Sequence, residues 1–221
     1  MERALIIGAS GGIGAAMMQA LTARGVAVTG LSRSATGLDV TDEVSVSAAF
    51  GALEPGFDLV FVATGALVID GAAPEKTIRR LTAQAMTDQF ALNCIGPSLV
   101  LKHSLRLLPR QGRSVFAALS ARVGSIGDNA LGGWYSYRTA KAALNQMIHT
   151  GAIELARTHK DAICVALHPG TVATPFTEDY AATHDTVPAD QAAANLLRVL
   201  DGLTPAETGQ FFDWQGKQVA W

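Results

Sequence analysis

The sequence predicts one α/β domain, in which helices cover both faces of a parallel sheet, and two observations support this prediction. Short apolar runs alternate along the chain with longer segments whose apolar residues recur at helical spacing. The short runs are almost continuously apolar, as expected of strands that are buried on both faces of a parallel sheet. A length of 221 residues suits a single domain, which we expect to span residues 1–221.

Six strands are expected, each ending near a glycine, a proline or a polar residue. In order, they are RALII (3–7), VAVTGL (26–31), DLVFVA (58–63), RSVFAAL (113–119), AICVAL (162–167) and a last run over 209–214. Such alternation predicts a doubly wound sheet, whose ligands bind beyond the carboxyl ends of the strands.

Helices are expected between these strands, and residues with known preferences at helix ends mark some of their limits. The first covers 12–24 and is closed by Gly25, and the second runs to about residue 50 with Thr41 as its N-cap. Residues 77–108 carry two helical patterns, which Gly96-Pro97 should break or kink. The remaining helices are expected over 136–158 and 189–200.

Composition and charge exclude several classes of protein. Hydrophobic residues make up 49% of the chain and charged residues 16%, which excludes a disordered chain. A net charge of −2 gives no attraction to nucleic acid or to an anionic membrane. Residues 4–23 carry no charge, but glycines and polar residues interrupt them, so we expect neither a membrane span nor a targeting segment.

The two cysteines predict a reducing compartment. Cys94 and Cys164 lie in apolar surroundings and match no metal-ligand spacing. We therefore expect buried, reduced thiols, no metal site and a cytoplasmic protein.

A glycine-rich turn, GASGGIG over residues 8–14, follows the first strand directly. Glycines at such a turn let the backbone approach a pyrophosphate closely, and the N-terminus of the following helix favours the negative charge. The spacing is G-x-x-x-G-x-G rather than G-x-G-x-x-G, and tight packing alone is the alternative explanation. The position after the first strand favours a dinucleotide.

The end of the second expected strand favours NADP(H) over NAD(H). Chains that use NAD tend to place an acidic residue roughly 20 residues beyond the glycines. This chain has Ser32-Arg33-Ser34 there and no acidic residue before Asp39. A forked guanidinium between two hydroxyls suits a 2′-phosphate, although a solvated loop arginine would leave the same pattern.

Tyr137 and Lys141 lie four residues apart on an expected helix and therefore share one face. A neighbouring ammonium is expected to lower the pKa of the phenol, so that it can exchange a proton with an alcohol near neutral pH. Ser120 closes the preceding strand, where its hydroxyl can stabilise a substrate oxygen. Asn93 can anchor a water or the lysine. Considered alone, Ser120 could be a loop cap and Asn93 a partner of helix backbone.

These motifs resemble, in their order, those of the short-chain dehydrogenase/reductase family over nearly the whole chain. The matching pieces are Gly8-x-x-x-Gly12-x-Gly14, Asp39-Val40, Ala63-Thr64-Gly65, Asn93-x-x-Gly96, Ser120, Tyr137-x-x-x-Lys141 and Pro169-Gly170 with Thr171 and Thr174. Residues 120–145 look most like the branch that includes bacterial C-factor, a dehydrogenase-like protein linked to cell–cell signalling.

The resemblance implies a seven-stranded Rossmann sheet and a catalytic tetrad of Asn93, Ser120, Tyr137 and Lys141. In the family's pattern the tyrosine is the acid/base and the serine orients the carbonyl. The lysine holds the nicotinamide ribose and lowers the pKa of the tyrosine, while the asparagine supports a proton-relay water. The resemblance also implies a homodimer or homotetramer formed through long helices at about 83–108 and 136–158.

Together, the glycine turn and the resemblance imply a set of cofactor-binding residues. The set is Gly8, Ser10, Gly11, Gly12, Ile13, Gly14, Ser32, Arg33, Ser34, Asp39, Val40, Ala63, Thr64, Gly65, Asn93, Tyr137, Lys141, Pro169, Gly170, Val172 and Thr174. Residues 62–65 depart from the family's Asn-Asn-Ala-Gly, so a structural asparagine is missing.

Residues 171–190 are expected to form the loop over the substrate. No lysine or arginine occurs from 161 to 197, which argues mildly against strongly anionic substrates such as acyl-carrier-protein or coenzyme A thioesters. The expected function is an NADPH-dependent carbonyl reductase or alcohol dehydrogenase that acts on a small molecule. The alternatives are a dinucleotide-binding signalling or regulatory protein with little or no catalysis, and a structural protein without a ligand.

Overall fold

Six parallel strands form one sheet in the computed structural model, which describes residues 1–173 and 186–221. The strand order is β2-β1-β3-β4-β5-β6. The bounds are β1 Arg3–Ile7, β2 Ala27–Leu31, β3 Leu59–Val62, β4 Ser114–Leu119, β5 Ala162–His168 and β6 Phe211–Asp213. Because β1 pairs with β2 on one side and β3 on the other, the winding reverses beside β1. Ligands of doubly wound sheets bind at such a reversal.

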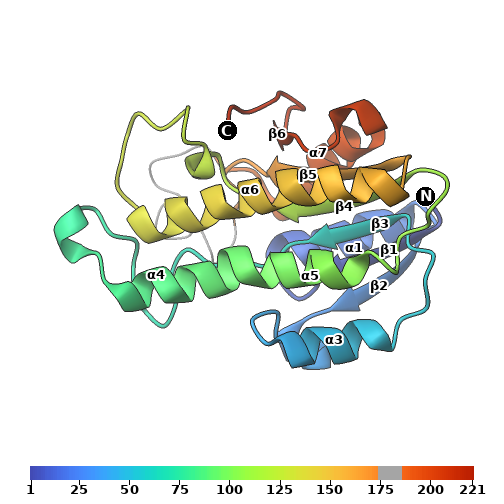
Figure 1. Ribbon diagram of the computed structural model, residues 1–221, viewed down its shortest axis with the longest axis horizontal. Helices are drawn as coiled ribbons and strands as arrows, with labels where there is room; N and C mark the ends of the chain where they lie inside the picture. Colours follow the sequence, from blue (N-terminus) through green and yellow to red (C-terminus); the bar gives the residue numbers. More distant parts are fainter. Residues whose placement is uncertain (174–185) are drawn as a thin grey trace.

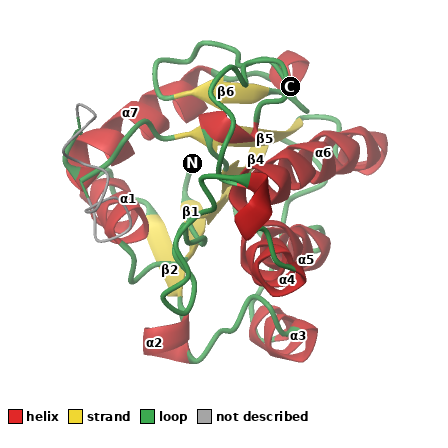
Figure 2. Cartoon of the chain, turned by 90° about the vertical axis from the view of Figure 1, so that its left-hand side faces the viewer, coloured by secondary structure: helices red, strands yellow, loops and turns green. Residues whose placement is uncertain are grey.

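Helices cover both faces of this sheet (Figure 2). On one face lie α1 (Gly12–Ala23) and α7 (Ala189–Gly202), which pack against each other. On the other lie α3 (Glu43–Gly51), α4 (Ala83–Phe90), α5 (Gly96–Ser104) and α6 (Tyr135–Thr158). Strand residues alternate between the two layers: Leu5 and Ile7 belong to one apolar core, and Ala4 and Ile6 to the other. The predicted doubly wound α/β architecture is therefore confirmed.

A π-helical segment, Ala91–Ile95, joins α4 to α5, and α6 lies alongside both helices (Figure 1). The sequence predicted a break or kink at Gly96-Pro97. Pro97 has no amide hydrogen to donate, and its ring would clash with the carbonyl of Asn93 in a regular α-helix. The wider π turn accommodates the proline, and it places the fully buried Asn93 inside the irregular segment.

Two expectations near the second strand were wrong. The N-cap of α3 is Asp42, whose carboxylate accepts from the amide of Val44, rather than Thr41. The resemblance also implied seven strands, whereas the described residues form six. After β2 the chain makes the short helix α2 (Arg33–Thr36), and the amide of Leu38 then bonds back to the carbonyl of Ser32 at 3.3 Å. This turn leaves no extended segment to pair with β2.

No helix in the two described ranges is long and apolar enough to cross a membrane. The cysteines are both free and buried, as the sequence predicted. Residues 1–173 and 186–221 contain no cluster of three or more histidine, cysteine, aspartate or glutamate side chains that could hold a metal ion.

Candidate active site

Five segments that carry candidate site residues follow the carboxyl ends of five neighbouring strands, at one edge of the sheet. Parallel strands end at the same edge, so segments that are distant in the sequence meet there. The segments are 8–14 after β1, 32–34 after β2, 63–65 after β3, Ser120 after β4, and 169–170 after β5.

The glycine turn is closed too tightly to admit larger residues. Gly8 has a φ of +85°, and its amide donates to the carbonyl of Leu31 at 2.8 Å. A Cβ at Gly14 would lie 2.2 Å from the carbonyl oxygen of Gly8. Gly11 is the N-cap of α1 without a capping side chain, and the first turn of α1 carries no acidic residue. Backbone amides at the start of α1 therefore remain available to an anion.

The residues around this turn fit a dinucleotide. Ser10, Gly11 and Gly12 are exposed and Ile13 is half-buried. A Cβ at Gly8 would lie 3.0 Å from the backbone of Ala63, so the two loops touch. Thr64 carries a buried hydroxyl that bonds to no described residue, and such a group is a natural partner for a polar ligand.

The loop after β2 holds Ser32 inside the structure and Arg33 and Ser34 at the surface. The Ser32 hydroxyl accepts from the amide of Ala35 at 3.2 Å and thereby caps α2. Hydrogen bonds from Thr41, assisted by the charge of Arg33, hold the pKa of the Asp39 carboxyl below its usual range.

Val40, one of the expected cofactor-binding residues, is 6% exposed and belongs to the core. A Cβ at Gly96 would lie 2.9 Å from its side chain, so Val40 packs closely on the start of α5.

Asn93 holds the loop after β3 through its side chain. Its amide nitrogen donates to the carbonyl of Ala66 at 2.9 Å and to Gln89 at 2.7 Å, and its oxygen accepts from the amide of Ala66 at 3.2 Å. These bonds hold the end of the loop over residues 62–65, where the family's structural asparagine is missing. A Cβ at Gly65 would lie 2.7 Å from Asn93 Oδ1 and 3.3 Å from Lys141 Nζ, so the asparagine and the lysine both border Gly65.

Lys141 is buried and points to the end of β4. Its Nζ donates to the carbonyl of Leu119 at 2.9 Å and lies 5.8 Å from the centre of the Tyr137 ring. Burial lowers the pKa of Lys141 to about 8.

The expected lowering of the Tyr137 pKa by Lys141 was wrong for this structure. The Tyr137 side chain is 5% exposed, and burial raises the pKa of its phenol well above the ordinary value. Desolvation disfavours the phenolate more strongly than the ammonium favours it, since Lys141 is itself buried and directed at a backbone carbonyl. The phenol is therefore neutral near pH 7 and carries a proton that it can donate.

Ser120 is buried at the end of β4, and its hydroxyl donates to Oδ1 of Asn145 at 2.6 Å. Asn145 lies one helical turn beyond Lys141 on α6. Sequence reasoning missed it, although the spacing Tyr137, Lys141, Asn145 places all three on one helix face.

Glu75 is a second residue that sequence reasoning missed. Its buried carboxylate accepts from the hydroxyl of Ser136 and from the Ser136 amide at 3.2 Å, and its carbonyl accepts from the amide of Trp134. Burial opposes its charge, but the Ser136 bonds hold the pKa of Glu75 below its usual range. Glu75 thus caps the start of α6 beside Tyr137. No local pattern could reveal this contact, which spans 61 residues.

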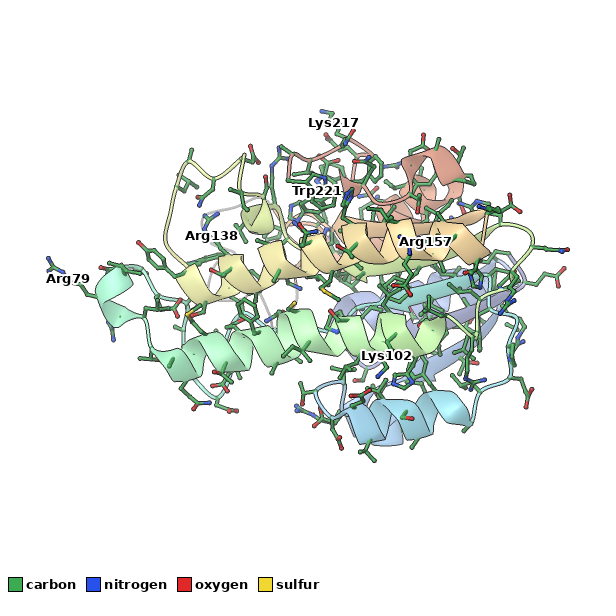
Figure 3. All side chains as sticks on the ribbon, viewed as in Figure 1. Arg79, Lys102, Arg138, Arg157, Lys217 and Trp221 are labelled. Atoms are coloured by element: carbon green, nitrogen blue, oxygen red, sulfur yellow. The ribbon has the colours of Figure 1, made fainter. Side chains whose placement is uncertain are left out.

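The long segment between Ser120 and Tyr137 is held by side chains at both ends. Arg122 pairs with Asp128 at 2.6 Å. Arg138, labelled near the start of α6 in Figure 3, donates to the carbonyls of Gly133 and Val123. These contacts fix the loop that leads into the Tyr137 helix.

The segment after β5 turns sharply at Gly170, which has a φ of +80° and lies against Trp214. Pro169 precedes it at the edge of the sheet. Val172 is 3% exposed and forms a β-bridge with Val187. Thr174 and positions 174–185 of the expected substrate loop lie outside the described residues.

The sheet and the residues at its carboxyl edge define a Rossmann-type α/β oxidoreductase. Residues 8–212 match the family model described as "Enoyl-(Acyl carrier protein) reductase". The chain is 35% identical over 240 residues to 1-hydroxy-2-glutathionyl-2-methyl-3-butene dehydrogenase of Rhodococcus sp., with all of both chains covered. It is 37% identical over 136 residues to C-signal of Myxococcus xanthus, covering 62% of this chain and 78% of that protein.

Solved structures show the same fold. NADPH-bound carbonyl reductase from chicken fatty liver superposes with a TM-score of 0.84 at 25% identity, covering 100% of this chain and 94% of that one. An NADP-bound short-chain dehydrogenase/reductase from Burkholderia multivorans gives a TM-score of 0.81 at 25% identity, covering 100% and 99%. The chain belongs to the short-chain dehydrogenase/reductase family.

Proposed function

We propose that the protein uses NADP(H) to interconvert a small carbonyl compound and its alcohol, with Tyr137 as the acid/base. The main support is a buried phenol one helical turn from a buried ammonium, at the sheet edge that also carries the glycine turn. A protein that only bound a nucleotide would have no need for Tyr137 and Lys141 on one helix face.

The bound cofactor would supply the hydride, and the residues of this chain would control the proton and the substrate oxygen. Tyr137 donates its phenolic proton to the oxygen of the carbonyl as negative charge develops there. Ser120 offers its hydroxyl to the same oxygen. The Lys141 ammonium would bind ribose hydroxyls of the cofactor and stabilise the phenolate left behind. Asn93 fixes the loop on which Gly65 approaches Lys141.

The direct test is NADPH oxidation measured against a library of aldehydes, ketones and quinones. Turnover with at least one class of carbonyl is expected. NADPH binding without oxidation by any compound would favour a signalling or regulatory role like that suggested by the similarity to C-signal.

We further propose that the chain forms a homodimer or homotetramer through two long helical segments, the one that runs from α4 to α5 and α6. The outer side of this helical layer exposes Ile95, Met147 and Ile153. Sedimentation or light scattering would give the number of chains per particle.

Arg33 is proposed to bind the 2′-phosphate that distinguishes NADPH from NADH. Replacing it with alanine should weaken NADPH binding by about tenfold, because a charge-assisted hydrogen bond contributes about 1.5–3 kcal/mol and this site is exposed. NADH affinity should change less than twofold. Isothermal titration with both cofactors measures the ratio.

Arg157→Ala is the matched control for Arg33, since Arg157 is an exposed arginine in the last turn of α6 (Figure 3). It should leave both affinities unchanged. Equal losses for NADPH and NADH in Arg33→Ala, or tighter NADH binding by the wild type, would contradict the assignment.

The charge of Lys141 predicts how kcat/KM for NADPH depends on pH. With a pKa of about 8, the amine is an ammonium below that pH and neutral above it. The value of kcat/KM for NADPH reports groups of the free enzyme. We expect it to be level at neutral pH and to fall about tenfold per pH unit above about pH 8. A profile that stayed level to pH 10 would show that the Lys141 charge is not needed.

A further inference from the structure

The Ser120 hydroxyl is bonded to Asn145, a residue that the proposed reaction does not otherwise use. Both side chains are buried, with Ser120 4% and Asn145 2% exposed. The Ser120 hydroxyl donates to Asn145 Oδ1 at 2.6 Å, and Asn145 Nδ2 faces the carbonyl of Gly124 at 3.5 Å. If the Asn145 carboxamide were flipped, its oxygen would face the carbonyl oxygen of Gly124, and two acceptors would meet. The contact with Gly124 therefore directs an acceptor at Ser120.

A serine hydroxyl has one proton to donate, and Asn145 holds that proton. A neutral substrate carbonyl is no better an acceptor than the carboxamide oxygen, so it has no advantage in competing for the proton. An oxygen that gains negative charge during hydride transfer is a much stronger acceptor, because hydrogen bonds to charged groups are about twice as strong. The Ser120 bond to substrate would then form mainly in the transition state, where it accelerates the reaction.

A cavity of about 270 Å³ borders Asn145 on the side of the C-terminal residue. It is lined by Gly124, Ile126, Ala142, Asn145, Gln146, His149 and Trp221. Trp221 lies beside α6, with its ring 5.6 Å from that of His149 (Figure 3). A site needs about 10–15 Å³ of such space to hold one water, so this cavity has room for water beside Asn145.

We propose that Asn145 is a positioning residue, which holds the Ser120 hydroxyl at the site until charge on the substrate oxygen takes over its hydrogen bond. This inference rests on the proposed function, since it concerns the same reaction. In this proposal, Asn145 sets the direction in which the Ser120 hydroxyl points its proton, without touching the substrate or the cofactor.

A double-mutant cycle of Ser120→Ala and Asn145→Leu tests this role. Leucine keeps the approximate shape of asparagine and removes the acceptor. We expect Asn145→Leu to lower kcat about tenfold without raising KM for the carbonyl, because the Ser120 hydroxyl is no longer held in one orientation. In the Ser120→Ala background the same substitution should lower kcat less than twofold, since Asn145 acts through Ser120.

Two further variants separate positioning from folding. Asn145→Asp replaces the neutral acceptor with a charged one, which competes with the substrate oxygen for the Ser120 proton, so it should recover little of the kcat lost in Asn145→Leu. Asn195→Leu removes a buried asparagine on α7 that bonds to Gln191, and it should lower the melting temperature without lowering kcat.

Equal losses from Asn145→Leu in the wild-type and Ser120→Ala backgrounds would overturn the positioning role while leaving the proposed function intact. If none of the carbonyls tested led the wild-type protein to oxidise NADPH, the proposed function would be overturned, and this inference with it. Melting temperatures of the four proteins in the cycle give an independent readout. They should be non-additive if Ser120 and Asn145 share a hydrogen bond, and additive temperatures would refute the contact itself.

Discussion

Replacing Tyr137 with phenylalanine should lower kcat by at least about a thousandfold, because it removes the proton donor of the proposed reaction. The phenyl ring should occupy the same buried site, so the fold and the NADPH affinity should change little. Burial of Tyr137 raises the pKa of the phenol, which keeps its proton in place at neutral pH. Stopped-flow or steady-state NADPH oxidation measures kcat, and titration of cofactor fluorescence measures binding.

Tyr135→Phe is the matched control, since Tyr135 lies at the first position of the same helix and is half-buried. It should keep kcat within about twofold of the wild-type value, as expected for surface changes away from a site. Wild-type turnover by Tyr137→Phe across a panel of carbonyls would show that another group supplies the proton.

The sequence was sufficient to predict the fold because most of the strands are buried on both faces. Runs such as LVFV in β3 and SVFAAL in β4 are apolar at nearly every position, and each is fully buried in the structure. The family resemblance implied a seventh strand, whereas the described residues form six. The local chain between β2 and α3 turns back at Gly37 and Leu38 instead of extending.

The loop motifs could be located from sequence because each follows directly after a strand, and the order of strands brings them together. Tyr137 and Lys141 could be located by their spacing on one helix. The directions of hydrogen bonds and the shifts in pKa could not be predicted in this way. A Tyr-x-x-x-Lys spacing indicates that two side chains share a helix face, but it does not reveal how deeply each is buried. Burial of both Tyr137 and Lys141 reversed the expected direction of the Tyr137 pKa.

Contacts between distant segments were the other part that sequence reasoning could not supply. Glu75 caps the start of α6 from a loop 61 residues earlier. Ser120 meets Asn145 across 25 residues. Each contact depends on how α6 packs against the sheet, which is a property of the assembled fold rather than of a local pattern.

Gly14→Ala should weaken NADPH binding more than about tenfold and lower stability as well. The added Cβ would lie 2.2 Å from the carbonyl oxygen and 2.9 Å from the carbonyl carbon of Gly8, so the backbone of the turn must move. Overpacking of this kind costs about 1–3 kcal/mol, which corresponds to a drop of several degrees in Tm for a chain of this length. Movement of the turn also displaces the amides at the start of α1 that would bind the pyrophosphate.

Gly51→Ala is the control for Gly14, because Gly51 is the last residue of α3 and a Cβ there meets nothing within 4 Å. It should leave NADPH affinity unchanged and, since alanine favours helix, raise stability by up to about 1 kcal/mol. Titration and thermal unfolding of both variants separate two roles of the turn. If Gly14→Ala melted lower but bound NADPH as tightly as the wild type, the glycines would serve packing alone. A loss of affinity in Gly14→Ala that Gly51→Ala does not share would place the dinucleotide at this turn.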